Sequence, residues 1–239
     1  MDRTAIRTSR AAMQVLLLSA SMVGGLMAQR SSPAITAELQ VAATGIAGKH
    51  HTLWLRTGPG KAPVKVSPTL RTFSLPISYK GPARADFFET AQDAQADPPT
   101  VQPLASVPLQ AGALLLVFVP DAESKTRAYR VHATRAGSFP HGSFNFINFS
   151  KSAIFVQSEG KAKDVRIDPD RNHVFKFGGA EQSVGIRVAA VAPGADHRLI
   201  RQTNFSTNPD WREMVLFFDQ PGTNRVRMSH LVDVRVDDP

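Results

Sequence analysis

The end of the chain alternates between apolar and other side chains with a period of two. The even positions between residues 225 and 236 hold Val226, Met228, His230, Val232, Val234 and Val236. This period is that of a β-strand with one dry face and one wet face, and it excludes an amphipathic helix over these residues. Two residues depart from the pattern, because His230 falls on the dry face and Leu231 on the wet face. We interpret His230 as a core histidine that makes one hydrogen bond.

The rest of the chain from residue 51 onward also consists of short apolar or alternating runs. The 17 prolines and 16 glycines are spread along the sequence, which favours many short elements separated by turns. Residues 113–119 are all apolar, and a short run that ends at a proline predicts a strand buried on both faces. Residues 91–103 are polar and contain paired prolines, which predicts a loop. Because no amphipathic helix is visible, we predict an all-β fold.

Two segments of the chain follow the same plan. Residues 112–134 and 212–233 each contain an apolar run, a turn with an acidic residue and a proline, and a basic alternating strand. Each half has room for about seven strands, which is the size of an immunoglobulin-like sandwich. We therefore predict two tandem immunoglobulin-like antiparallel β-sandwich lobes, at residues 51–137 and 138–239. One larger β-sandwich is the alternative.

The N-terminus has the composition of a secretory signal. Arg3, Arg7 and Arg10 precede an apolar run at residues 15–28, and the chain turns polar at Gln29. At about 1.5 Å per residue this run reaches roughly 21 Å, which is short of a hydrocarbon core of about 30 Å. We predict a signal peptide at residues 1–28, a linker or disordered arm at 29–50, and no membrane span after cleavage. An uncleaved anchor is the alternative, and the expected location is the periplasm or the outside of the cell.

The composition excludes several classes of function. The sequence has no cysteine, so disulfides, thiol catalysis and cysteine-ligated metals are excluded, and stability must come from a sizeable core. The formal net charge is +8, and the predicted signal peptide carries three arginines and one aspartate, so its removal leaves +6. The basic residues are scattered without a cluster or a nucleic-acid-binding motif, which predicts that the protein does not bind nucleic acid.

An aromatic segment, SFPHGSFNFINFS, occupies residues 138–150. It begins with a turn around His141, and in a regular strand Phe144 and Phe146 would point to one face and Ile147 to the other. A β-bulge between Phe146 and Ile147 would place all the apolar side chains on one face and the asparagines outside. We expect this bulge, and a strand that is apolar on both faces is the alternative. Any function of the segment is then assigned to the His141 turn.

Several short motifs occur together in a recognisable order. These are Tyr79-x-Gly81-Pro82, the run 114–119, Tyr129-Arg130-Val131, Ser138-Phe139-Pro140-x-Gly142-Ser143 and Asn148-x-Ser150. In these motifs the chain resembles an uncharacterised family of exported bacterial proteins of similar length. The resemblance implies an exported all-β protein, and it supplies no catalytic residues.

No motif with a known catalytic mechanism stands out. The glycine-flanked serines do not form the G-x-S-x-G elbow, and no histidine pair has the H-E-x-x-H setting. Asp168-Pro169-Asp170 begins like a calcium loop but lacks the later glycine and glutamate, so we interpret it as a turn. We predict a protein that is not an enzyme and that has no metal and no cofactor.

The candidate ligand-binding residues are Trp211, Asp210, Glu213 and His141. An exported protein with these features is expected to have a non-catalytic binding or assembly role, with an envelope protein or polysaccharide as its partner. A carbohydrate-binding module or glycan-active enzyme is the alternative, with stacking on Trp54, Trp211 and Tyr79. A third hypothesis, a metallohydrolase, requires three of five histidines to converge: His132, His141, His173, His197 and His230.

Overall fold

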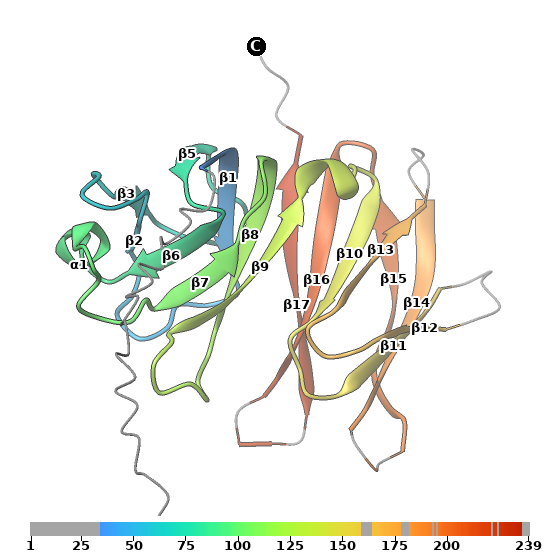
Figure 1. Ribbon diagram of the computed structural model, residues 1–239. Coiled ribbons are helices and arrows are strands. Elements are labelled where there is room, and N and C mark those ends of the chain that lie inside the picture. The colour runs from blue at the N-terminus through green and yellow to red at the C-terminus, as the bar shows by residue number, and fades with distance from the viewer. Residues whose placement is uncertain are drawn as a thin grey trace, which may run out of the picture. The chain divides into compact units, whose positions relative to one another are not determined.

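The computed structural model of the protein (Figure 1) describes residues 34–158, 164–177, 182–192, 194, 196–220, 222–223 and 225–235. The predicted signal peptide lies outside these residues. Strands hold 56% of the residues and helices 4%, which confirms the all-β sandwich class. Within the described ranges, no helix has both the length and the apolar character needed to cross a bilayer.

The first half of the chain forms two sheets. Sheet A has the order β4-β1-β8-β9, with β5 also paired to β1, and sheet B has the order β3-β2-β6-β7. The strands of sheet A are β1 Ile35–Ala43, β4 Thr69–Leu70, β5 Ile77–Gly81, β8 Gly112–Pro120 and β9 Tyr129–Arg135. The strands of sheet B are β2 Leu53–Leu55, β3 Val64–Val66, β6 Arg84–Phe88 and β7 Ala105–Pro108. Two short helices, α1 (Ala91–Gln95) and the 3₁₀ turn η1 (Ala136–Ser138), complete this half.

The second half forms two further sheets with no helix among its described residues. Sheet C has the order β13-β10-β16-β17, and sheet D has the order β12-β11-β14-β15. The strands of sheet C are β10 Ser143–Asn148, β13 Asn172–Lys176, β16 Trp211–Asp219 and β17 Val226–Val234. The strands of sheet D are β11 Ala153–Ser158, β12 Val165–Ile167, β14 Gln182–Val191 and β15 Arg198–Thr207.

The two halves repeat one topology. In sheet A the first strand, β1, runs parallel to β8, and in sheet C the first strand, β10, runs parallel to β16. The other sheet of each half follows the same order, since β3-β2-β6-β7 corresponds to β12-β11-β14-β15. The two segments that share a plan in the sequence become the β8–β9 and β16–β17 hairpins, which occupy equivalent places in sheets A and C.

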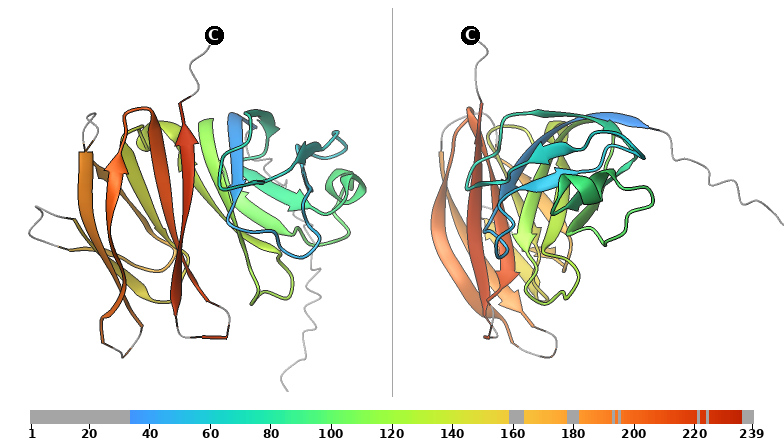
Figure 2. Two further views of the ribbon diagram at one scale, coloured as in Figure 1. Left: turned by 180° about the vertical axis from the view of Figure 1, so that it is seen from behind. Right: turned by 90° about the vertical axis from the view of Figure 1, so that its left-hand side faces the viewer.

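Three apolar cores separate the four sheets, which follow one another as layers (Figures 1 and 2). The first core lies between sheets B and A, and the second lies between sheets C and D. The third joins the halves, because it brings Leu115 and Val117 of β8 together with Met214 and Leu216 of β16. Strand β8 is therefore buried on both faces, as the unbroken apolar run predicts.

The expected bulge in the aromatic segment is wrong. Strand β10 pairs regularly through Phe146 and Ile147 with both of its neighbours, β13 and β16. Phe144 and Phe146 contribute to the core between sheets C and D, whereas Ile147 contributes to the core between sheets A and C. The strand is apolar on both faces because a sheet covers each face, and even its Asn145 is fully buried.

The burial of Leu231 on β17 also results from a second sheet that covers this part of the strand. Its neighbours on the wet face of β17 are polar, but Leu231 itself is 1% exposed and packs in the core between sheets A and C. The half-buried Asp233 lies on this face too, where it forms an ion pair with the buried Arg212 of β16 at 2.7 Å. The face that looks wet in the sequence is thus covered by the first half around Leu231, whereas Arg225 and Arg227 on the same face are exposed.

The predicted linker at residues 29–50 is also wrong over most of its described part. Residues 35–43 form β1, which lies inside sheet A, where β8 pairs with one of its edges and β4 and β5 pair with the other. Its inward residues are small or aliphatic, and Leu39 and Val41 are fully buried. Within the predicted loop 91–103, the helix α1 begins after Thr90, whose hydroxyl accepts a hydrogen bond from the Asp93 N–H.

Candidate functional site

A polar groove opens at one side of the sandwich that sheets C and D form. The groove lies where the edge strand β15 of sheet D faces the edge strand β17 of sheet C, and where β16 begins. Elsewhere the space between these sheets is filled by phenylalanine and aliphatic side chains. The groove encloses about 240 Å³, and its lining includes Arg201, Thr203, Phe205, Trp211, Glu213 and His230.

Alternation along two paired strands places the acidic and basic groups of the groove on one face. On β16, Glu213 shares its face with Val215 and Phe217, which pack in the core between sheets C and D. On β17, His230 pairs with Val215, so it is the diagonal neighbour of Glu213 on that face. The Nδ1 atom of His230 contacts a carboxylate oxygen of Glu213. The His230 ring also stacks on Phe205 of β15, with 5.5 Å between the ring centroids.

Trp211 forms one end of the groove. It is the first residue of β16, and its carbonyl accepts a hydrogen bond of 2.7 Å from the Gly142 N–H. The indole ring is half-buried, and its Nε1–H is enclosed without a hydrogen-bond partner in the structure. A buried donor without a partner costs about 1–3 kcal/mol.

Arg201 enters the groove from the inner face of sheet D. It pairs with Val188, which is buried in the core between sheets C and D, so Arg201 points to the inner side of the sheet. It shares this face with Thr203 and Phe205 by ordinary alternation. A β-bulge precedes it, because Ala189 lies opposite Leu199 and Ile200 is an extra residue. The bulge leaves Leu199 on the outer face, where it is 56% exposed.

The four predicted site residues have different places. Trp211 and Glu213 line the groove. Asp210 is an exposed turn residue whose carbonyl accepts from the Arg235 N–H at 2.6 Å, and it does not line the groove. His141 lies in the turn next to Gly142 and is half-buried, with its Nε2 atom enclosed and unpaired. Burial, and then the nearby Arg212, lower the pKa of His141.

The predicted aromatic platform does not form. Tyr79 is 1% exposed, and its hydroxyl donates to the Pro82 carbonyl at 2.8 Å. Trp54 is half-buried on β2 of sheet B, whereas Trp211 lies on β16 of sheet C. Since these residues belong to different sheets, only Trp211 is available to the groove. Sequence reasoning missed Arg201 and Phe205. It also missed that part of the His230 side chain is exposed at the groove.

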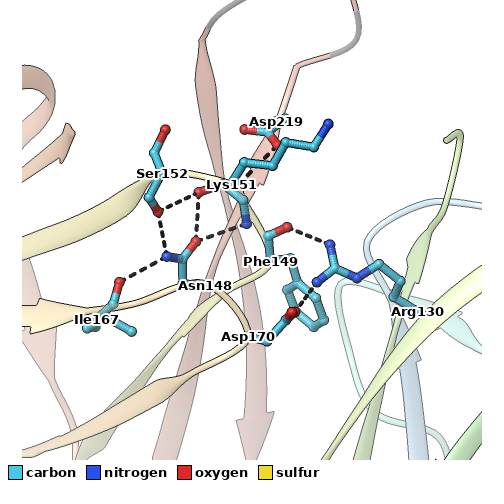
Figure 3. A network of polar contacts seen from close by, with 9 residues as sticks. Arg130, Asn148, Phe149, Lys151, Ser152, Ile167, Asp170 and Asp219 are labelled. Atoms are coloured by element: carbon cyan, nitrogen blue, oxygen red, sulfur yellow. Dashed lines mark hydrogen bonds and ion pairs between the residues drawn. The ribbon is translucent and has the colours of Figure 1, made fainter. Parts of the chain in front are cut away.

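The densest polar network belongs to the junction of the two halves (Figure 3). Arg130 of β9 donates to the Phe149 carbonyl at 2.7 Å, pairs with Asp170 and lies over the Phe149 ring. Asp168–Asp170 is the predicted turn between β12 and β13, and here it serves to hold sheet A against sheet C. Burial lowers the pKa of the neighbouring His132, and Asp170 partly opposes this effect.

The buried Asn148 completes this network. Its amide nitrogen donates to the Ser152 carbonyl at 2.8 Å and to the Ile167 carbonyl at 2.9 Å, and its oxygen accepts from Ser150. Every group that Asn148 offers is used inside the protein, so this network is structural. No set of three histidine and acidic side chains suited to a metal ion occurs in the residues that the structure describes.

Comparison of the sequence with models of known protein families finds no match, and comparison with curated proteins finds no significant match.

Proposed function

We propose that the protein is exported and acts without catalysis as a binding protein of the cell envelope or the exterior. The groove between β15 and β17 is its ligand site in this proposal. The observation that carries the proposal is the hollow itself, where the half-buried Trp211 lies beside Glu213 and the partly exposed His230. Binding sites of this kind combine an aromatic wall with a few polar groups that fix orientation.

The arrangement of acidic groups supports binding rather than hydrolysis. Hydrolysis of a glycosidic bond commonly uses two carboxyl groups, separated by about 5 to 9.5 Å, on either side of the bond. Glu213 is the one carboxylate that lines the groove among the described residues, and it is already engaged by His230. A carbohydrate-binding module is the form of the proposal that Trp211 favours, since sugar rings pack on aromatic faces.

Two further inferences belong to the same proposal. We infer that the repeated topology represents two tandem immunoglobulin-like lobes, because each half has its own pair of sheets and its own core. We infer export from the arginines and the apolar run of residues 1–28. Cell fractionation and N-terminal sequencing test the second inference, and the mature chain is expected to begin at Gln29 outside the cytoplasm.

The binding role is tested by retention of fractionated envelope material on the immobilised protein. The wild type is expected to retain a component that Trp211→Ala and His230→Ala lose. Trp54→Phe is the matched control, since Trp54 is half-buried on another sheet and should leave retention unchanged. Retention that persists in both groove variants would exclude this groove as the binding site.

A further inference from the structure

A second hollow continues the groove along the same two strands. It encloses about 420 Å³, and its lining includes Ser152, Asp196, Arg198, Ile200, Arg225 and Val226. On β15 the first hollow begins at Arg201, directly after the last residue of the second hollow. On β17 the second hollow includes Val226 and the first includes Met228 and His230. The two hollows therefore adjoin end to end along one seam between β15 and β17.

The seam is long enough for an extended ligand. From Arg198 to Ser206, at about 3.3 Å per residue, β15 extends over roughly 26 Å. Aromatic side chains lie at one end, where Trp211 and Phe205 line the first hollow. A chain molecule with repeating units fits this layout better than a single compact ligand.

The charges along the seam are mainly positive. Arg198, Arg201 and Arg225 line it, and none of the three forms an ion pair within the parts of the chain that are described. Two acidic residues are also present, Asp196 in the second hollow and Glu213 in the first. Because Glu213 contacts His230, the arginines remain available to an anion.

The shape of β15 argues against a peptide as the occupant. A peptide would bind by adding a strand to the free edge of sheet D, which requires a regular edge. The bulge at Ile200 and the inward-pointing Arg201 interrupt this edge, and both features are known to prevent strand addition. A polysaccharide needs no such edge, because its hydroxyl and carboxylate groups bind side chains.

We propose that the seam binds an extended acidic polysaccharide whose sugar units carry carboxylates, as uronate polymers do. Arg198, Arg201 and Arg225 bind the carboxylates, and one sugar ring packs on the exposed part of the Trp211 indole. This inference rests on the proposed function, since it names the ligand class of the same site.

The test measures binding of the purified protein to polygalacturonate and to alginate by calorimetry at low and high salt. Methyl-esterified polygalacturonate is the matched uncharged polymer. The variants are Arg201→Gln, the double variant Arg198→Gln and Arg225→Gln, and Trp211→Ala. Arg187→Gln is the control, because Arg187 is exposed on β14, where it pairs with Gln202 on the other face of sheet D. Thermal unfolding verifies that each variant is folded.

We expect the protein to bind an acidic polymer more tightly than the esterified one, and to bind it less tightly as salt rises. Each seam arginine is expected to account for about a fivefold change in affinity, whereas Arg187→Gln leaves the affinity nearly unchanged. Equal affinity for the esterified polymer, or equal effects of Arg187 and Arg201, would overturn the inference while the binding role stands.

Three further outcomes are also decisive. Binding of polyglutamate but of no polysaccharide would replace the proposed ligand with an acidic peptide. Absence of binding to polygalacturonate and alginate, together with groove-dependent retention of some other envelope component, would overturn the acidic polysaccharide alone. Loss of both kinds of binding would overturn the proposed function as well.

Discussion

Several buried polar side chains in this protein are matched to particular backbone groups. Asn148 is fully buried, yet both its nitrogen and its oxygen have partners within 3 Å. Tyr129 of β9 is tied to the turn at residues 47–50, since its hydroxyl donates to the His50 carbonyl and accepts from the Ala47 N–H. Such pairs offset the cost of removing polar groups from water. They also explain why the short motifs around Tyr79, Tyr129 and Asn148 are structural.

Tyr79 is expected to make stability depend on alkaline pH. Burial, and then the nearby Asp86, raise the pKa of Tyr79 to about 12, against about 10 in an unfolded chain. The neutral phenol therefore contributes stability that is fully present below pH 10 and is lost as the pH rises through about 12. The difference between the pKa of Tyr79 in the folded and in the unfolded chain corresponds to roughly 3 kcal/mol of unfolding free energy.

The measurement is an absorbance titration of phenolate formation, combined with denaturant unfolding across the same pH range. The protein has two tyrosines, so Tyr79→Phe leaves a titration of Tyr129 alone. Near neutral pH the Phe variant is expected to have an unfolding free energy about 1 kcal/mol below that of the wild type, because the hydrogen bond to the Pro82 carbonyl is gone. This difference is expected to shrink as the pH rises, because only the wild type loses the contribution of Tyr79. Ionisation of Tyr79 near pH 10 in the folded protein would contradict this account.

At the scale of single elements, burial on two faces distinguishes β8, β10 and β16 from ordinary sandwich strands. Each of these strands contributes alternate side chains to two different cores. In β10, Phe146 faces sheet D and Ile147 faces sheet A. A strand of this kind has no wet face, so apolar and polar residues do not alternate along it.

Ile147→Ala is expected to reduce the free energy of unfolding by about 2–5 kcal/mol, because the side chain is 1% exposed and its removal leaves a cavity. Denaturant unfolding measures the change. The control is Val234→Ala, since Val234 is 54% exposed on β17 and its truncation should change stability by less than about 0.5 kcal/mol. A small effect at Ile147 would indicate that the first half does not cover β10.

Sequence reasoning succeeds for elements and fails where a second layer is involved. The apolar run of β8 and the alternation of β17 predict their strands directly, because the signal lies within each strand. The burial of Leu231 and the regularity of β10 depend on the first half, which contributes nothing to the local pattern. The residues of β1 predict a linker because they are small and show no clear hydrophobic face, and the partner strand β8 lies far along the chain.

At the candidate site, too, some features follow from the local sequence and others depend on distant parts of the chain. Trp211 and Glu213 are two residues apart on one strand, so their common face follows from the period of two. His230 was expected to be an ordinary core residue, but its side chain is 37% exposed at the groove. Arg201 is in phase with the buried Phe205, but which face of β15 is covered becomes visible only in the pairing of β15 with β14.

At the scale of the whole molecule, the third core and Arg212 join the two halves. Arg212 is 6% exposed and donates to the carbonyls of Ala136 and Phe139, each at 2.7 Å. Asp233 balances its charge. Because these groups connect β16 and β17 with the segment that follows β9, we expect the halves to unfold together.

Two tryptophans allow this expectation to be tested, since Trp54 lies in sheet B and Trp211 in sheet C. Fluorescence of the Trp54→Phe and Trp211→Phe variants is expected to report one common midpoint of unfolding. Arg212→Ala leaves the Asp233 carboxylate without its partner at a cost of about 3–5 kcal/mol, and it should separate the two midpoints.

Arg227→Ala is the control, because Arg227 is exposed on β17 of the same sheet and should leave a single midpoint. Separate midpoints in the unmodified protein would contradict the expected coupling between the halves.

The place of β1 has a consequence for how the chain acquires its structure during synthesis. The strand that emerges first pairs in parallel with β8, which begins at Gly112. The middle of sheet A therefore stays open until most of the first half has been made, and the second half repeats this delay between β10 and β16. Pairing over such separations is slow and leaves strand edges uncovered meanwhile. A chain of this protein that has not yet emerged in full should thus depend on chaperones until each penultimate strand arrives.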